Sequence, residues 1–197
     1  MRGFLELEGG VLRRGGPISL LEVGGYLIIV NPSEVLAHED EITVGIKGGR
    51  VRVTDQAYTK VLKGSRVRIS VEIEGDEVYY YPHPMLFFDR SGARIMTKVR
   101  ALKRARVVEA YILGRRGSNE EFTDGDILAT TEIYYGDKLV IYDVFRGDKS
   151  YKSVNVMGKE ALLAVYEVSE GEYRFEKFIS DYREIDRLWR AATGIHF

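Results

Sequence analysis

Short runs in which apolar and polar residues alternate recur along most of this chain, and this pattern constrains the fold more than any other feature. Residues 3–8 alternate in this way, and further runs follow over 18–23 and 26–31, with Gly24-Gly25 between these two. Three later pairs of alternating runs flank Gly48-Gly49, Gly75-Asp76 and Gly136-Asp137, and such two-residue links favour hairpins. Strands that follow one another about every eight to twelve residues indicate a β-sandwich, a barrel or stacked sheets.

The length and the lack of obvious division favour one domain. The chain has 197 residues, enough for one large domain or two small ones, and it can bury a substantial core. It shows no exact repeat and no low-complexity linker. Its 13 tyrosines suit a sheet, where aromatic cross-strand pairs are stabilising. We therefore expect a single domain over residues 1–197.

The C-terminal segment, residues 170–197, differs from the rest. A strand over 172–179 is followed by an amphipathic helix that Asp181 can cap and Gly194 can end. One helical stripe holds Tyr182, Ile185, Leu188, Trp189 and Ala192. The lone tryptophan, Trp189, fits either a core position or an aromatic anchor for a partner.

Two segments are less regular. Residues 54–64 have small and polar residues at their centre, which indicates a turn or a single helical turn. Residues 81–95 contain two prolines around His83, and these bar regular sheet pairing and set a bend. His83 fits a packed or rim position better than a ligand position.

Charge and composition exclude several classes of function. Lys plus Arg number 29 and Asp plus Glu 30, so the net charge of −1 gives no global attraction to nucleic acid or to an anionic membrane. The absence of cysteine excludes disulfides, thiolate metal sites and a cysteine nucleophile. Imidazole can come only from His38, His83 and His196, so any metal site must rely on carboxylates with one or two histidines, which bind metal more weakly and exchange it faster. No apolar signal core or membrane-length run occurs, and we expect a cytoplasmic protein.

Two stretches carry candidate chemistry. The run of His38, Glu39, Asp40 and Glu41 fits either a solvated charged loop or a transient metal station. In the segment 109–122, Glu109 lies within a strand that ends at Gly114 and is followed by Arg115. The simplest interpretation of that segment is a strand with one face in solvent and then a basic loop.

Known catalytic motifs are missing. The sequence has no phosphate-binding loop, no dinucleotide-binding glycine motif and no nucleophile elbow. Paired carboxylates are present, but the sequence does not show which of them face each other. A binding or scaffolding protein is therefore the better interpretation than an enzyme.

The order of four segments resembles the UreD family of urease accessory proteins, called UreH in some organisms. These segments are TDQAYTKVLKG, YYYPHPMLFFDRSGARI, EAYILGRRGSNEEFTDG and TEIYYGDKLVIYD, and the ending RLWR is similar to the terminal Leu-Trp segment of the family. The resemblance spans roughly residues 26–145. It implies a mainly β fold of stacked antiparallel and mixed sheets, described as β-helical and sandwich-like, with a short C-terminal helix.

The chain departs from the family pattern in two places. Glu34, Val35, His38 and Glu39 stand where family members have glycines before the equivalent of Asp40. Glycine permits backbone conformations that other residues resist. The chain is also shorter than is usual for the family, mostly after residue 150, so a partner-binding surface is expected to be trimmed.

The resemblance implies a non-enzymatic scaffold or chaperone for urease maturation. Proteins of this family form a hetero-oligomer with UreF and the GTPase UreG, dock on apo-urease and assist nickel delivery through an internal tunnel. It therefore implies no tightly bound cofactor, but transient binding of nickel. Loosely held oxygen ligands suit such transfer, because a tight site would stop it.

The resemblance also assigns site residues. Asp40, Thr59, Glu109 and Asp143 match polar positions of the tunnel, and His38 lies beside the first of them. Arg115 matches the arginine of the family's Leu-Gly-Arg motif, and it fits a counter-ion for Glu109 or Asp143 slightly better than a direct partner contact. Gly114, Lys60 and Trp189 are the other candidates for structural or partner roles.

Two other functions remain open at this point. One is a β-sheet module, unrelated to urease, that binds carbohydrate or protein through exposed tyrosines. The other is a hydrolase with two carboxylates roughly 5–10 Å apart.

Overall fold

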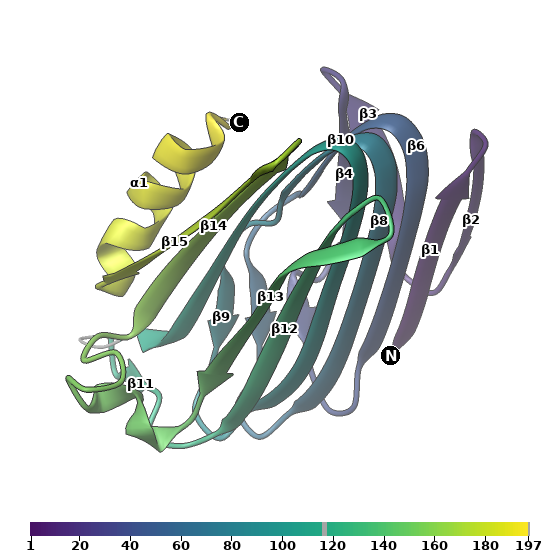
Figure 1. Ribbon diagram of the computed structural model, residues 1–197. Coiled ribbons are helices and arrows are strands. Elements are labelled where there is room, and N and C mark those ends of the chain that lie inside the picture. The colour runs from purple at the N-terminus through teal and green to yellow at the C-terminus, as the bar shows by residue number, and fades with distance from the viewer. Residues whose placement is uncertain (116–117, 197) are drawn as a thin grey trace.

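The chain folds into β-strands with one helix at its C-terminal end, as the computed structural model shows for residues 1–115 and 118–196 (Figure 1). The three longest strands are β6, β8 and β10, and the other elements add to the sheets that these form. In chain order the elements are β1 (Arg2–Glu8), β2 (Val11–Gly15), β3 (Ser19–Val23), β4 (Tyr26–Val30), β5 (Val35–Leu36), β6 (Glu41–Asp55), β7 (Thr59–Val61), β8 (Arg66–Tyr81), β9 (Met85–Phe87), β10 (Gly92–Arg115), β11 (Glu120–Glu121), β12 (Asp126–Tyr135), β13 (Lys138–Gly147), a 3₁₀ turn (Lys149–Lys152), β14 (Ala161–Ser169), β15 (Glu172–Ser180) and α1 (Tyr182–Thr193).

The centre of the molecule is a β-helical stack of parallel strands. Strand β8 pairs in parallel with β6 on one side and with β10 on the other, and the short strands β5, β7 and β9 pair in parallel on another side of the stack. Val35, Lys60, Leu86 and Ile112 stand in one column, so one rung takes about 26 residues. The expectation of a mainly β, β-helical fold with a C-terminal helix is confirmed. The rung repeat is structural and was not visible as an exact sequence repeat.

Each long strand bends near its middle, so its two halves lie in two facing sheet layers (Figure 1). We call the layer formed by the N-terminal halves of β6, β8 and β10 the first layer, and the layer formed by their C-terminal halves the second layer. Gly48 of β6 and Gly75 of β8 are register partners at this bend, and a Cβ on Gly75 would lie 2.9 Å from the carbonyl oxygens of Gly48 and Gly49. The prediction of hairpins at Gly48-Gly49 and Gly75-Asp76 is therefore wrong. The chain passes through both sites inside continuous strands, because the glycines let the backbones approach closely and turn a corner. The hairpin at Gly136-Asp137 is confirmed, since β12 and β13 pair antiparallel with Tyr135 opposite Lys138.

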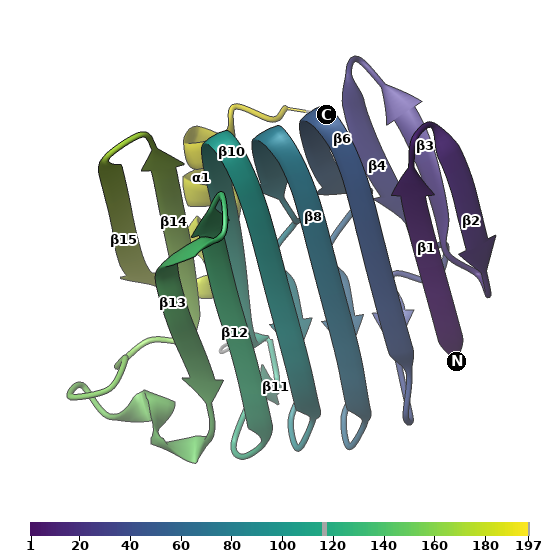
Figure 2. The ribbon, with the colours of Figure 1, turned by 45° about the vertical axis from the view of Figure 1, so that its right-hand side comes forward.

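Hairpins extend the stack at both ends. At the N-terminal end β1–β2 adds to the first layer through β6, and β3–β4 adds to the second layer through the other half of β6. At the other end β12–β13 adds to the first half of β10, and β14–β15 adds to its second half (Figure 2). The segment 54–64, expected to be only a turn, contains the strand β7.

Two apolar cores follow from the alternation of the strands. The inward residues of both layers form the larger core, and the outward residues of the second layer form a smaller core under α1. Ile185 and Trp189 of α1 are fully buried there, and Gly194 ends the helix in the left-handed conformation, as predicted. The predicted side-chain cap by Asp181 is wrong: Asp181 pairs with Lys159, and the Glu160 carboxylate accepts the Tyr182 N–H instead.

Within the described ranges, no helix has the length and apolar character needed to span a membrane.

Candidate functional site

Glu109 lies inside the stack, between the two layers. It is 3% exposed, and each of its carboxylate oxygens accepts a hydrogen bond from a threonine hydroxyl. Thr97 Oγ1 donates to Oε1 at 2.7 Å, and Thr131 Oγ1 donates to Oε2 at 2.6 Å. Thr97 and Thr131 are register partners on β10 and β12 in the first layer, whereas Glu109 comes from the second half of β10, in the second layer. The hydrogen bonds therefore join the two layers. The solvent-exposed interpretation of the Glu109 strand is therefore wrong.

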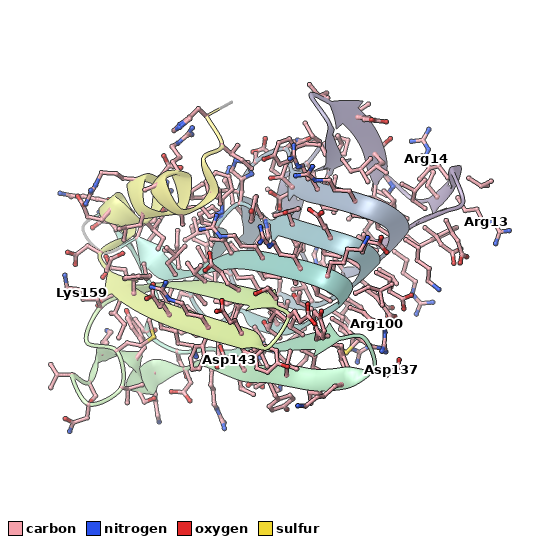
Figure 3. All side chains as sticks on the ribbon, turned by 45° about the horizontal axis from the view of Figure 1, so that its top comes forward. Arg13, Arg14, Arg100, Asp137, Asp143 and Lys159 are labelled. Atoms are coloured by element: carbon pink, nitrogen blue, oxygen red, sulfur yellow. The ribbon has the colours of Figure 1, made fainter. Side chains whose placement is uncertain are left out.

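A sequence of polar contacts connects this carboxylate with the surface. Tyr166, on β14, is buried, and its hydroxyl donates to Asp143 Oδ2 at 2.7 Å. Lys177, on β15, donates to Asp143 Oδ1 at 2.6 Å. Figure 3 shows Asp143 where β13 faces the β14–β15 pair. We call the set Thr97, Glu109, Thr131, Tyr166, Asp143 and Lys177 the interior polar chain.

The titration behaviour of the interior polar chain reflects its burial. Burial raises the pKa of Glu109, and the hydrogen bonds from Thr131 and Thr97 lower it in part. The pKa of Tyr166 is raised by burial and then by the charge of Glu109 and the contact with Asp143, while a hydrogen bond with Thr131 acts in the opposite direction. Thr131, which donates to Glu109, is the register partner of Asp143, so the two carboxylates lie on either side of one pair of positions on β12 and β13.

Asp40 lies in the turn before β6 and does not join the interior polar chain. Its carboxylate accepts the Ala37 N–H at 2.8 Å and pairs with the amino group of Met1. It opens with Glu39 and Glu41 on a surface hollow that Arg66, Arg68 and Arg94 also line. The structure therefore brings Glu109 and Asp143 together and leaves Asp40 apart.

Thr59 lies on β7 and lines a different pocket, at the N-terminal end of the stack. Asp55 and Tyr80 line the same pocket. Asp55 accepts hydrogen bonds from the backbone of His83 at 2.6 Å and contacts its Nδ1 at 2.9 Å, and burial raises the pKa of Asp55. Burial raises the pKa of Tyr80, and the charges of Asp55 and Glu109 raise it further.

The loop before Asp40 keeps glycine-like backbone conformations without glycine. Glu34 has a φ of 52° and His38 a φ of 53°, in the left-handed region that glycine adopts without strain. Both are positions where the resemblance implies glycine, and the backbone follows a glycine-compatible path at them. The His38 side chain is exposed, and its backbone N–H donates to Ser65 Oγ at 3.1 Å.

The residues predicted to have structural roles are placed as follows. Gly114 has a φ of 71°, and a Cβ there would lie 2.4 Å from the Phe122 nitrogen, so glycine is required. Arg115 pairs with Glu120, so its predicted pairing with Glu109 or Asp143 is wrong. Arg116 and Gly117, which complete the predicted basic turn, lie outside the described residues. Lys60 Nζ lies 3.5 Å from a carboxylate oxygen of Glu34.

Trp189 is a core residue, as one of its two predicted interpretations has it. Its Nε1 donates to the Pro82 carbonyl at 2.8 Å, and its ring lies against the His83 imidazole with the centroids 4.3 Å apart. His83 is 7% exposed, which confirms a packed histidine. Together these contacts attach α1 to the bend after β8.

Sequence reasoning missed Thr97, Thr131 and Tyr166, although a signal was present. Thr97 falls in the apolar phase of its strand between Ile95 and Val99, and Thr131 falls likewise between Ala129 and Ile133. A polar residue in the buried phase of a strand needs a partner, so two threonines in this phase indicate an interior polar site. Among the described residues, no group of three His, Asp or Glu side chains is arranged to hold a metal ion.

Comparison with known proteins agrees with this architecture. The model of the UreD urease accessory protein family matches residues 18–188. A search of the curated proteins found no match. The family match covers most of the chain, including the whole interior polar chain, and it decides against a binding module unrelated to urease. The chain belongs to the UreD urease accessory protein family.

Proposed function

We propose that this protein assists the maturation of urease as a non-enzymatic scaffold in the cytoplasm, which binds apo-urease together with UreF and the GTPase UreG and helps to deliver nickel. Family membership supports the urease accessory role. The observation that supports nickel handling is the interior polar chain, in which buried Glu109 accepts from Thr131, and Asp143, the register partner of Thr131, accepts from Tyr166 and Lys177 near the surface.

The chemistry of this chain suits brief contact with a divalent cation. Its carboxylate, hydroxyl and phenol oxygens are weak, exchangeable ligands for nickel, in contrast to a thiolate or multi-histidine site. A cation near Glu109 would replace the threonine hydroxyls as the partner of the carboxylate. Because burial raises the pKa of Glu109, a cation would compete with a proton for this position.

The direct test is maturation of urease with variants of this protein. Asp40→Ala combined with Glu109→Ala is expected to lower urease activation while the complex with UreF and UreG still forms. Nickel bound per urease active site, measured by elemental analysis, reports the outcome. Unchanged nickel content with the double variant would remove the metal path from this protein.

Separate single variants identify which carboxylates take part. Glu109→Gln and Asp143→Asn keep side-chain size and remove the charge, and both are expected to lower nickel content. Asp137→Asn is the matched control, because Asp137 lies fully exposed in the β12–β13 turn and pairs with Arg100 at 2.9 Å (Figure 3). If Asp40→Ala alone has no effect, the path uses Glu109 and Asp143 without the Asp40 loop.

A further inference from the structure

The outer face of the first layer is open, whereas α1 covers part of the outer face of the second layer. Figure 2 shows the open face toward the reader, across β13, β12, β10, β8, β6 and β1, with α1 behind it. Within the described ranges, no helix or strand covers this face. Its exposed side chains are therefore available to a partner.

One row of residues across this face carries no charge. The strand registers align six outward positions, one from each of the six strands. Phe4, Met96 and Val144 in this row are 50%, 44% and 41% exposed. The full row, which we call the uncharged row, is Phe4, Thr43, Ser70, Met96, Thr130 and Val144.

The rows on either side carry opposite net charge. The row that lies two residues before the uncharged row, counted along β6, contains four arginines and one glutamate. The row that lies two residues after the uncharged row along β6 contains three glutamates and one lysine. The arginine row is Arg2, Glu41, Arg68, Arg94, Leu128 and Arg146, and the acidic row is Glu6, Gly45, Glu72, Lys98, Glu132 and Tyr142.

Arg68 is the least satisfied charge on the face. In the register it lies between Glu41 on β6, which pairs with Arg2, and Arg94 on β10, whose like charge is destabilising. Arg94 is paired with Asp126 at 2.5 Å, and Arg2 with Glu41 at 3.6 Å. Among the residues that the structure describes, no carboxylate lies within 4.0 Å of the Arg68 guanidinium. A carboxylate from another molecule would satisfy Arg68 and relieve its repulsion with Arg94.

The middle of the uncharged row is hollowed. Thr43, Ser70 and Thr130 have short side chains, and they line a shallow hollow with Met96 and Leu128. Among the described residues, no side-chain hydrogen bond joins the hydroxyls of Thr43, Ser70 or Thr130 to another residue. The hollow can therefore receive apolar side chains and still offer hydrogen bonds.

We propose that this face docks an amphipathic helix of a partner protein whose apolar stripe lies along the uncharged row and whose carboxylates face the arginine row. Six neighbouring strands span about 24 Å, which corresponds to roughly 16 residues of helix. Basic side chains on the opposite edge of that helix would face the acidic row. Because the two flanking rows carry opposite charge, they also determine which edge of the helix lies over which row.

The test uses apo-urease, UreF and UreG as the candidate partners, and in this it rests on the proposed function. Binding of each to the purified full chain is measured by titration calorimetry with wild type, Met96→Glu, Arg68→Glu and the control Val154→Glu. Val154 is 87% exposed in the loop after β13, so its variant has the same charge as Met96→Glu but lies outside this face. Arg68→Glu exchanges one repulsive neighbour for another, because it becomes attractive toward Arg94 and repulsive toward Glu41, so its net effect on folding should be small.

We expect both face variants to weaken binding of at least one of the three proteins by about tenfold or more, since each places an unpaired charge in the contact. Val154→Glu should bind as wild type does. If wild type binds and both face variants bind equally well, the docking face is wrong and the proposed function stands. If wild type binds none of the three, both proposals fail. If wild type alone forms a dimer that Met96→Glu dissociates, a second copy occupies the face and the proposal is overturned.

Discussion

The hydrogen bonds from two threonines to Glu109 should stabilise the fold by an amount that depends on the charge of Glu109. Both hydroxyls donate to separate carboxylate oxygens at 2.6–2.7 Å in a buried site. A hydrogen bond to a charged group contributes about 1.5–3 kcal/mol, and a neutral one about 1 kcal/mol. Replacing both threonines by valine should therefore lower the free energy of unfolding by about 4 kcal/mol at neutral pH, but by only about 2 kcal/mol when Glu109 is glutamine.

The pH dependence gives a second measure of the same contact. Burial holds the pKa of Glu109 above its ordinary value of 4.5 in the folded protein. Between 4.5 and the raised pKa the folded state binds more protons than the unfolded state, so stability falls as pH rises through this window. The threonine donors lower the folded pKa, and their removal widens the window. The valine variants should thus lose more stability at pH 8 than at pH 5, and Glu109→Gln should remove this slope.

Urea unfolding followed by tryptophan fluorescence is suited to this measurement, because Trp189 is the single tryptophan and is fully buried. Wild type and three variants form a double-mutant cycle, with the threonine pair as one change and Glu109→Gln as the other. An equal loss on threonine replacement in both backgrounds, at both pH values, would refute the contact between the hydroxyls and a carboxylate.

Three further changes test other parts of the fold. Gly114→Ala should lower the free energy of unfolding by more than about 1 kcal/mol in thermal unfolding, because it adds a Cβ at a positive φ with no room for it. His38→Gly should raise it by about 0.5 kcal/mol, since relief of the left-handed conformation outweighs the added chain entropy; a loss of stability would contradict this. Trp189→Ala should lower it by about 3–5 kcal/mol, and Trp189→Phe by less, as measured by circular dichroism; a neutral Trp189→Ala would show that α1 is not needed for the fold.

The alternation of residues predicted many of the strands, but it missed β2 and β14, and it did not predict how the strands connect. Gly48-Gly49 and Gly136-Asp137 are similar local signals, yet the first is a bend and the second a hairpin. Glycine allows either outcome. The outcome at Gly48 depends on Gly75, about 27 residues away, which approaches its carbonyl across the neighbouring parallel strand. A contact between rungs is not visible in a local pattern.

The candidate site was predictable only in part for a related reason. Glu109 and Asp143 were identified through resemblance, and the structure places both on the interior polar chain. Thr97, Thr131 and Tyr166 could be recognised only once the inward phase of each strand was known. The partner of Arg115 was wrong because Glu120, five residues along the chain, competes with the distant carboxylates and wins by proximity.

A buried glutamate that only maintained the fold would be hard to explain on energetic grounds. An uncharged side chain of similar shape in its place avoids the cost of burying a charge, so Glu109→Gln should be at least as stable as wild type at neutral pH. If Glu109 serves nickel transfer, the same variant should mature urease poorly. The two measurements then change in opposite directions, which is the relation expected when a residue is retained for function at the expense of stability. If Glu109→Gln instead lowered stability and left nickel delivery intact, Glu109 would be a structural residue and the interior polar chain would have no role in transfer.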